Sequence, residues 1–341
     1  MALYAFVISA GNGAGVLRRV DLTTGSSTTL SLGDAQTDIA YDGTSLYVSS
    51  ANPSALTDPA NRIDVINPDT MTVTDSYATS GTVLELLPYN GDLFATRFGS
   101  SGDIIKISSG SIVGTFSYGT ETYSEIIECS GDLFVASQTS SNAITIRRID
   151  TAGTSIANIT TTYTGSPTTF PQSIATDGST VFLGLGPLVA TSGADRILYV
   201  SASTNTVTTD IDVQTQLPFG APLRRYPIKL TADGADTVWG SQGFVERVMK
   251  LDVGAGTLTQ FQPVPATDPT LAATGIYYYD GSVYVCGTSN VTAGGTSSIT
   301  VHDPVSDAQT ASYTFALSGA SDLIVLDLPS ARGWVVGSVG W

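Results

Sequence analysis

The residues best suited to chemistry are acidic side chains that recur at one position of an internal repeat, each directly before an isoleucine or leucine. They are Asp38, Glu85, Glu125 and Asp322. In the other repeats the same position holds Ser173, Lys229 and Gly275. Paired carboxylates can exchange protons as general acid and base, or they can bind calcium, which prefers hard oxygen ligands. Carboxylates that only line a solvated surface need no ligand. Two interpretations of these acidic residues therefore remain, a cation site and a solvated acidic lining.

The acidic column belongs to a repeat of roughly 40–50 residues, the length typical of a propeller blade. An aliphatic column follows it, made of Ile39, Leu86, Ile126, Ile174, Leu230, Ile276 and Leu323. A second column is aromatic, made of Tyr47, Phe94, Phe134, Phe182, Trp239 and Tyr284. Between the two columns lie pairs such as Asp42-Gly43 and Asp280-Gly281, which close β-hairpins because glycine tolerates a positive φ. Each repeat therefore begins with two antiparallel strands.

Each repeat continues with a second hairpin. Its first strand is predicted at 16–21, 62–67, 103–108, 145–150, 196–201, 247–252 and 298–303, and a Thr/Ser/Val-rich strand follows. Four short strands per repeat predict an all-β fold, a seven-bladed β-propeller of four-stranded antiparallel blades in a single domain over residues 1–341. The strand nearest the axis should be the first, so that the acidic column would line one end of a central channel.

Strands from both chain termini should complete one blade and so close the ring. Two segments compete for the second place in that blade, Leu3–Ile8 and Trp334–Val339. We favour Leu3–Ile8, with Tyr4 in the aromatic column. The segment that loses would add an edge strand or a tail.

Composition excludes some functions. The chain has 14 basic and 30 acidic residues, a formal net charge of −16, which argues against nucleic acid and anionic membrane surfaces as partners. The first residues, MALYAFVISAG, lack the cationic start of a signal peptide, and their apolar run is too short to span a membrane. We therefore expect synthesis in the cytoplasm without membrane insertion.

Cysteine and histidine are scarce, with two cysteines and one histidine in the chain. Cys129 and Cys286 fall in non-adjacent repeats, which predicts two buried free thiols. His302 is the single histidine and falls in an otherwise aliphatic column, which predicts a half-buried, hydrogen-bonded imidazole. The aspartates that end the third strands, such as Asp21 and Asp150, are expected to bond backbone N–H groups of the following turns. We therefore predict no catalytic residues and no cofactor apart from calcium at the acidic column.

One basic and aromatic cluster lies in the long connection 214–227. It consists of Phe219, Arg224, Arg225 and Tyr226. Such a loop can simply pack its own aromatic rings. Arginine and aromatic residues are also enriched in interface cores, so these four residues are our candidate contact patch for a partner.

The units DIAYDGTSLYVSS and RIDVINPDT, at 38–50 and 62–70, and GIYYYDGSVYVCG, at 275–287, resemble the YVTN-type seven-bladed propeller repeat of surface-layer and other extracytoplasmic proteins. The resemblance implies a toroid with the first strand innermost. It implies little about function, because propellers host binding proteins, scaffolds and enzymes. Propeller lyases of the streptogramin type need more than one histidine, whereas a lactonase-like calcium site would need the acidic column.

Three functions fit these observations. We favour a non-catalytic interaction or structural propeller that decorates or attaches a virus particle and contacts other protein subunits or a cell-surface receptor. Scarce lysine, Ser/Thr/Gly-rich strands and the missing leader are consistent with a protein that is assembled inside a cell and exposed on the virion surface or outside the cell later. The alternatives are a calcium-dependent lactonase- or glycosidase-like hydrolase acting at the acidic channel mouth, and an intracellular or periplasmic protein-binding scaffold.

Overall fold

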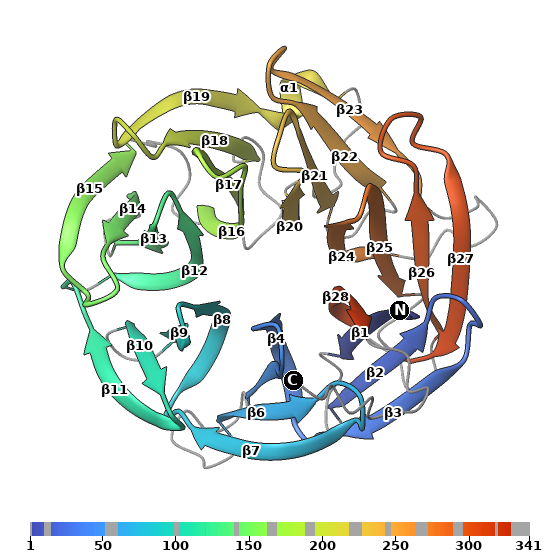
Figure 1. Cartoon of the computed structure of the whole chain (residues 1–341). Coiled ribbons are helices and arrows are strands. Elements are labelled where there is room, and N and C mark those ends of the chain that lie inside the picture. Colours follow the sequence, from blue (N-terminus) through green and yellow to red (C-terminus); the bar gives the residue numbers. More distant parts are fainter. Residues whose placement is uncertain are drawn as a thin grey trace, which may run out of the picture.

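Seven four-stranded antiparallel sheets are arranged as blades around an axis (Figure 1). The computed structural model describes residues 2–9, 15–51, 61–98, 102–119, 121–139, 143–161, 169–187, 195–217, 227–242, 247–263, 272–288, 296–317 and 320–328. We number the blades from the first complete one along the chain. The first strand of each blade lies nearest the axis and the fourth is outermost, as the repeat predicts.

Blade 1 contains β4 (Ala35–Tyr41), β5 (Leu46–Ala51), β6 (Arg62–Asn67) and β7 (Thr72–Ala78). Blade 2 contains β8 (Thr82–Tyr89), β9 (Asp92–Phe98), β10 (Asp103–Ser108) and β11 (Ser111–Phe116). Blade 3 contains β12 (Thr122–Cys129), β13 (Asp132–Gln138), β14 (Ile144–Ile149) and β15 (Ser155–Thr161). Blade 4 contains β16 (Thr169–Thr176), β17 (Thr180–Pro187), β18 (Arg196–Ser201) and β19 (Thr206–Asp212), and the short helix α1 (Val213–Gln216) follows it. Blade 5 contains β20 (Pro227–Ala232), β21 (Thr237–Gln242), β22 (Arg247–Asp252) and β23 (Thr257–Phe261). Blade 6 contains β24 (Ala272–Tyr279), β25 (Ser282–Thr288), β26 (Thr296–His302) and β27 (Gln309–Ala316).

Blade 7 closes the ring with strands from both ends of the chain. Its innermost strand is β28 (Ala320–Leu328), and β1 (Ala2–Ser9), β2 (Val16–Asp21) and β3 (Ser27–Ser31) complete it. The prediction that Leu3–Ile8 fills the second place is therefore confirmed, because β1 pairs with β28 on one side and β2 on the other. The competing segment Trp334–Val339 lies outside the described residues.

The register of β1 corrects one detail. Phe6, not Tyr4, occupies the aromatic column, because Phe6 pairs with Arg19 as Phe94 pairs with Lys106. Side chains two residues apart on a strand share a face, so the sequence pattern alone could not separate the two rings. Phe6 is fully buried, whereas Tyr4 lies two residues earlier in β1 with the Arg19 guanidinium 5.1 Å from its ring centre.

The hydrophobic core is divided into seven clusters, one at each interface between neighbouring blades. The aliphatic column packs against the preceding blade, as Leu86 does against Ala40 and Ile63 of blade 1. The residue after it faces the following blade, as Ile127 of blade 3 does. Each blade thus buries both faces only against its neighbours, which is why the ring must close.

Turns fix the ends of the strands. The turn pairs between the first two strands each have a glycine with φ between 72° and 99°; they are Asp42-Gly43, Asn90-Gly91, Ser130-Gly131, Asp177-Gly178, Asp233-Gly234 and Asp280-Gly281. The carboxylate of Asp21 accepts hydrogen bonds from the N–H groups of Thr23 and Thr24, and Asp303 does the same with Val305 and Ser306. These aspartates terminate strands, as expected.

Basic side chains tie four of the outer turns to the preceding blade. Arg19 donates to the carbonyl of Pro68, Lys106 to that of Thr151, Arg148 to that of Ala202 and Lys250 to that of Pro304. Each donor lies on the third strand of one blade, and each acceptor lies in or beside the turn after the third strand of the next blade. These contacts hold the blades in fixed relative positions and therefore hold the inner strands in place around the axis.

Candidate functional site

The acidic column reaches the axis because every inner strand contains a β-bulge. In each of the seven, the residue directly before the acidic column has no partner on the second strand; these residues are Thr37, Leu84, Ser124, Gln172, Ile228, Thr274 and Ser321. A bulge bends its strand and re-aims the side chains beside it. Seven equivalent bulges therefore bring the column residues to the centre of the ring.

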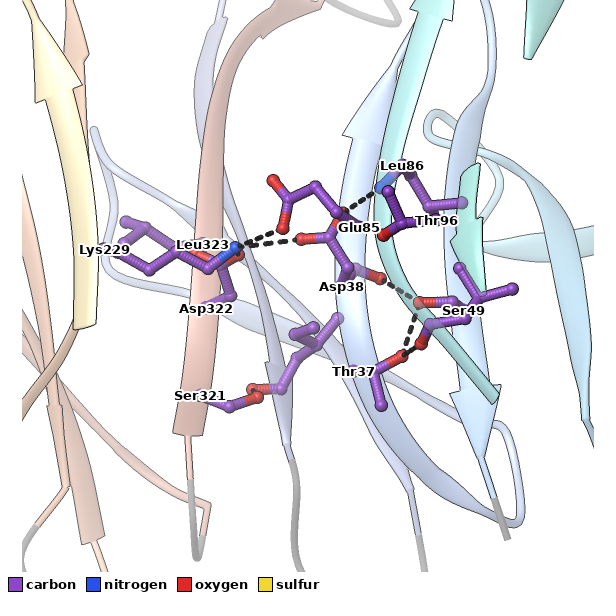
Figure 2. A network of polar contacts seen from close by, with 12 residues as sticks. Thr37, Asp38, Ser49, Glu85, Leu86, Thr96, Lys229, Ser321, Asp322 and Leu323 are labelled. Carbon is purple, nitrogen blue, oxygen red and sulfur yellow. Dashed lines mark hydrogen bonds and ion pairs between the residues drawn. The ribbon is translucent and has the colours of Figure 1, made fainter. Parts of the chain in front are cut away.

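One ammonium group holds three of the carboxylates together. Lys229 Nζ on β20 lies 3.2 Å from Asp38 Oδ1, 3.1 Å from Glu85 Oε2 and 3.1 Å from Asp322 Oδ2 (Figure 2). These partners come from blades 1, 2 and 7, so the Lys229 side chain crosses the axis from blade 5. We call Lys229, Asp38, Glu85, Asp322 and Glu125 the axial cluster.

Small residues make room for this crossing. Ser173 and Gly275 flank Lys229 in the column, on blades 4 and 6. A Cβ atom added to Gly275 would lie 3.0 Å from Asp322 Cα, which is tighter than ordinary contact. Glycine at this position therefore lets β24 and β28 approach closely enough to place Asp322 beside Lys229.

Asp38 is the most enclosed member of the axial cluster, with 3% of its side chain exposed. Its Oδ2 accepts a hydrogen bond of 2.7 Å from the backbone N–H of Leu86 on the neighbouring inner strand (Figure 2). Inner strands are paired on one side only, so their other backbone groups need partners at the axis. Asp38 thus accepts a hydrogen bond from a free strand edge and contacts the Lys229 ammonium at the same time.

The pKa values reflect burial of more negative than positive charge. Burial raises the pKa of Glu85 to about 8 and that of Glu125 to about 7, and the Lys229 ammonium opposes both shifts. Burial, followed by the charge of Glu85, raises the pKa of Asp38 well above its ordinary value. Burial alone would lower the pKa of Lys229, but the four carboxyl groups outweigh it and hold that pKa well above its ordinary value. Near neutral pH the axial cluster therefore retains protons as well as its ammonium.

The Lys229 ammonium is the positive charge that lies among these carboxyl groups. Within the described residues, no group of three or more His, Cys, Asp or Glu side chains is arranged to hold a metal ion. Asp38, Glu85 and Glu125 are each the fourth residue of their inner strand. The sequence placed Lys229 in the column; the structure shows that its charge is shared by three carboxylates.

His302 is more enclosed than predicted, with an exposed fraction of 1%. Its Nδ1 lies 3.2 Å from the Asp307 carbonyl and its Nε2 lies 3.0 Å from Thr300 Oγ1. Burial lowers its pKa. The ring packs on Phe261 at a centroid distance of 4.9 Å, so both nitrogens and one face are engaged in structure.

The two cysteines are free and buried, as predicted. They lie on β12 and β25 in blades 3 and 6. Burial raises the pKa of the Cys129 thiol and raises that of Cys286 to about 12. Neither thiol has the lowered pKa of a nucleophilic cysteine.

The candidate contact patch Phe219, Arg224, Arg225 and Tyr226 lies outside the described residues. No helix in the part of the chain that the structure describes combines the length and the apolar character needed to span a bilayer.

Comparison with known proteins supports the architecture alone. The structure is similar to that of apo AztD from Citrobacter koseri, with a TM-score of 0.57, 11% identity, and coverage of 95% of this chain and 98% of that one. It is also similar to a chain in the crystal structure of the Mitotic Checkpoint Complex, with a TM-score of 0.58, 14% identity and 82% coverage of both chains. No family model and no curated protein matches the sequence. At these identities the likeness concerns the propeller fold.

Proposed function

We propose that the protein is a non-catalytic interaction propeller that serves as a decoration or attachment subunit on the exterior of a virus particle. The observation that carries the non-catalytic part is the position of Lys229, whose ammonium is within 3.2 Å of Asp38, Glu85 and Asp322. The residues most suited to acid–base work are thereby engaged with one another. An axial cluster of this kind stabilises a ring and leaves the contacts with other molecules to its outer surfaces.

The setting on a particle rests on composition. Net charge of −16, three lysines at positions 106, 229 and 250, and exposed outer strands such as β7, whose sequence is TVTDSYA, suit a surface that must stay soluble next to many copies of itself. The kinship with YVTN-type propellers remains a prediction from the repeat. Other protein subunits of the particle, or a receptor on the host cell, are the partners that this setting implies.

Purified particles from the source organism test the proposal directly. Electron microscopy with a specific antibody should place the protein on the outside of the particle, and its absence from washed particles would contradict the proposal. A variant carrying E85Q and E125Q should associate with particles as the wild type does. If the wild type instead turns over a small ester or glycoside and this variant does not, the protein is a hydrolase acting at the axial cluster.

A further inference from the structure

Most of the outermost strands share a β-bulge near their start. Five of the seven contain a β-bulge near their start, where one residue has no partner on the third strand. In three of them this residue is a threonine whose hydroxyl donates to a third-strand carbonyl: Thr74 to Val65 (3.1 Å), Thr208 to Tyr199 (3.4 Å) and Thr310 to Val301 (3.1 Å). At these bulges the threonine hydroxyl thus bonds the outer strand to the third strand.

Blades 2 and 3 depart from this pattern. Their bulge residues are Val113 and Ile156, which have no hydroxyl and are 59% and 48% exposed. Ile112 is 40% exposed beside Val113, and Val73 is 42% exposed on the preceding outer strand. The described residues expose six large apolar side chains, and these four lie on the consecutive outer strands β7, β11 and β15 (Figure 1). We call Val73, Ile112, Val113 and Ile156 the apolar rim.

The strands that carry the apolar rim are in contact with one another through their turns. A Cβ added to Gly110, just before β11, would lie 3.3 Å from the Tyr77 ring and 3.7 Å from Asp75 Oδ2 of β7. Phe116 of β11 packs in the same way against Gly153 in the turn before β15. The three strands that carry the rim therefore follow one another end to end along one side of the ring (Figure 1).

Bulges also indicate how a partner would bind here. A bulge interrupts the row of free backbone groups on an edge strand and so disfavours addition of another strand. The outer strands without a bulge, β3 and β23, are only five residues long. The apolar rim consequently offers side chains, rather than a strand edge, to a partner.

The charges around the apolar rim indicate which charge a partner would carry. Every described lysine and arginine of blades 1 to 3 is paired with a carboxylate; these bases are Arg62, Arg97, Lys106, Arg147 and Arg148. Asp75 is exposed on β7 and forms no ion pair within the described part of the chain. A second copy of this chain would bring the same excess of negative charge, so like charges would oppose it.

We infer that the apolar rim is the docking surface for a partner protein whose contact surface has an apolar centre flanked by lysine or arginine. The inference deepens the proposed function and rests on it for the identity of the partner as a particle protein. Burial of the exposed valine and isoleucine side chains would provide affinity, and the basic flanks would face Asp75.

The test exchanges the bulge residues between blades. A V113T/I156T variant installs the threonine that blades 1, 4 and 6 already carry, so it should fold with an unchanged melting temperature. It should bind particles stripped of the protein at least about tenfold more weakly than wild type, because two apolar anchors are lost. The matched control T208V/T310V makes the opposite change in blades 4 and 6 and should bind as wild type does. D75N should weaken binding less, and mainly at low salt.

The outcomes separate the two proposals. Equal binding of wild type and V113T/I156T to particles overturns the docking surface and leaves the proposed function standing. If wild type does not bind particles, the proposed function fails, and a displayed library of random peptides decides the docking surface. Apolar peptides flanked by Lys or Arg that bind wild type but not V113T/I156T support it, and a library that yields no such peptide overturns it. Sedimentation that shows a dimer abolished by V113T/I156T would identify a second copy as the occupant and also overturn it.

Discussion

Replacing Lys229 by methionine is the most direct test of the axial cluster. The substitution keeps an unbranched side chain of similar length and removes the one ammonium that three carboxylates share at 3.1–3.2 Å. At an effective dielectric constant of about 20, each such contact amounts to about 5 kcal/mol before desolvation and repulsion between the carboxylates are subtracted. Removing one partner of a buried ion pair typically costs about 3–5 kcal/mol in net stability, which is the loss we expect at pH 8.5.

The cost of K229M should depend on pH. Glu85 and Glu125 have pKa values of about 8 and about 7 in the folded protein, so both are mostly charged at pH 8.5 and both carry protons at pH 5. Fewer uncompensated charges remain at pH 5, and we expect the loss there to be less than half of that at pH 8.5. Lys250 provides a matched control, because its side chain is 19% exposed against 20% for Lys229 and its partner is a single carboxylate, Asp307. K250M should cost about 1 kcal/mol at both pH values.

Guanidinium unfolding at the two pH values, followed by circular dichroism and intrinsic fluorescence, measures these differences. The buried Trp239, stacked on Tyr278 at a centroid distance of 5.3 Å, contributes to the fluorescence signal. The reasoning is refuted if K229M is as stable as wild type at pH 8.5, or if K229M and K250M lose the same stability at both pH values. A pH-independent loss specific to K229M would show that Lys229 contributes through packing and not through charge.

Three further predictions concern other buried groups. The folded pKa of Glu125, about 7, exceeds its ordinary value of 4.5. The stability that Glu125 contributes is therefore complete below pH 4.5 and is lost as pH rises through 7, a change of about 3 kcal/mol. E125Q should flatten the decline of stability between pH 5 and 8.5, whereas D236N, in an exposed turn, should leave that decline unchanged. The thiols of Cys129 and Cys286 should not react with a disulfide reagent in the folded protein, and both should react at the rate of unfolding; rapid labelling of native protein would contradict their burial. Burial lowers the pKa of His302, so the contribution of this residue to stability should fall as pH drops below 6.5; H302L should abolish that part of the acid sensitivity, and an unchanged difference in melting temperature between pH 5 and 7 would show that the imidazole is not the cause.

The repeat made the architecture predictable from the sequence. Alternating columns set which residues face the neighbouring blades, and turn pairs such as Asp42-Gly43 set where strands end. All seven predicted third strands are present within two residues of the expected bounds. The closing blade was also predictable in outline, because an unpaired strand at each end of a repeat protein must find a partner. The register of β1 could not be predicted, because Tyr4 and Phe6 share one face of the strand. Only the pairing of Phe6 with Arg19 and Ile324 in the structure shows which ring occupies the aromatic column.

The sequence by itself determined which side chains form the axial column, because the column is a matter of position within the repeat. Only the tertiary structure decided what that column does. The bulges that aim it at the axis add one residue without changing the polarity pattern, so Thr37 or Ser321 looks like any other strand residue in sequence. The crossing of Lys229 to blades 1, 2 and 7 depends on closure of the ring, which places residues that are 191 and 144 positions apart within 3.2 Å. Charge pairing across an axis is a property of the closed ring, and no single repeat contains it.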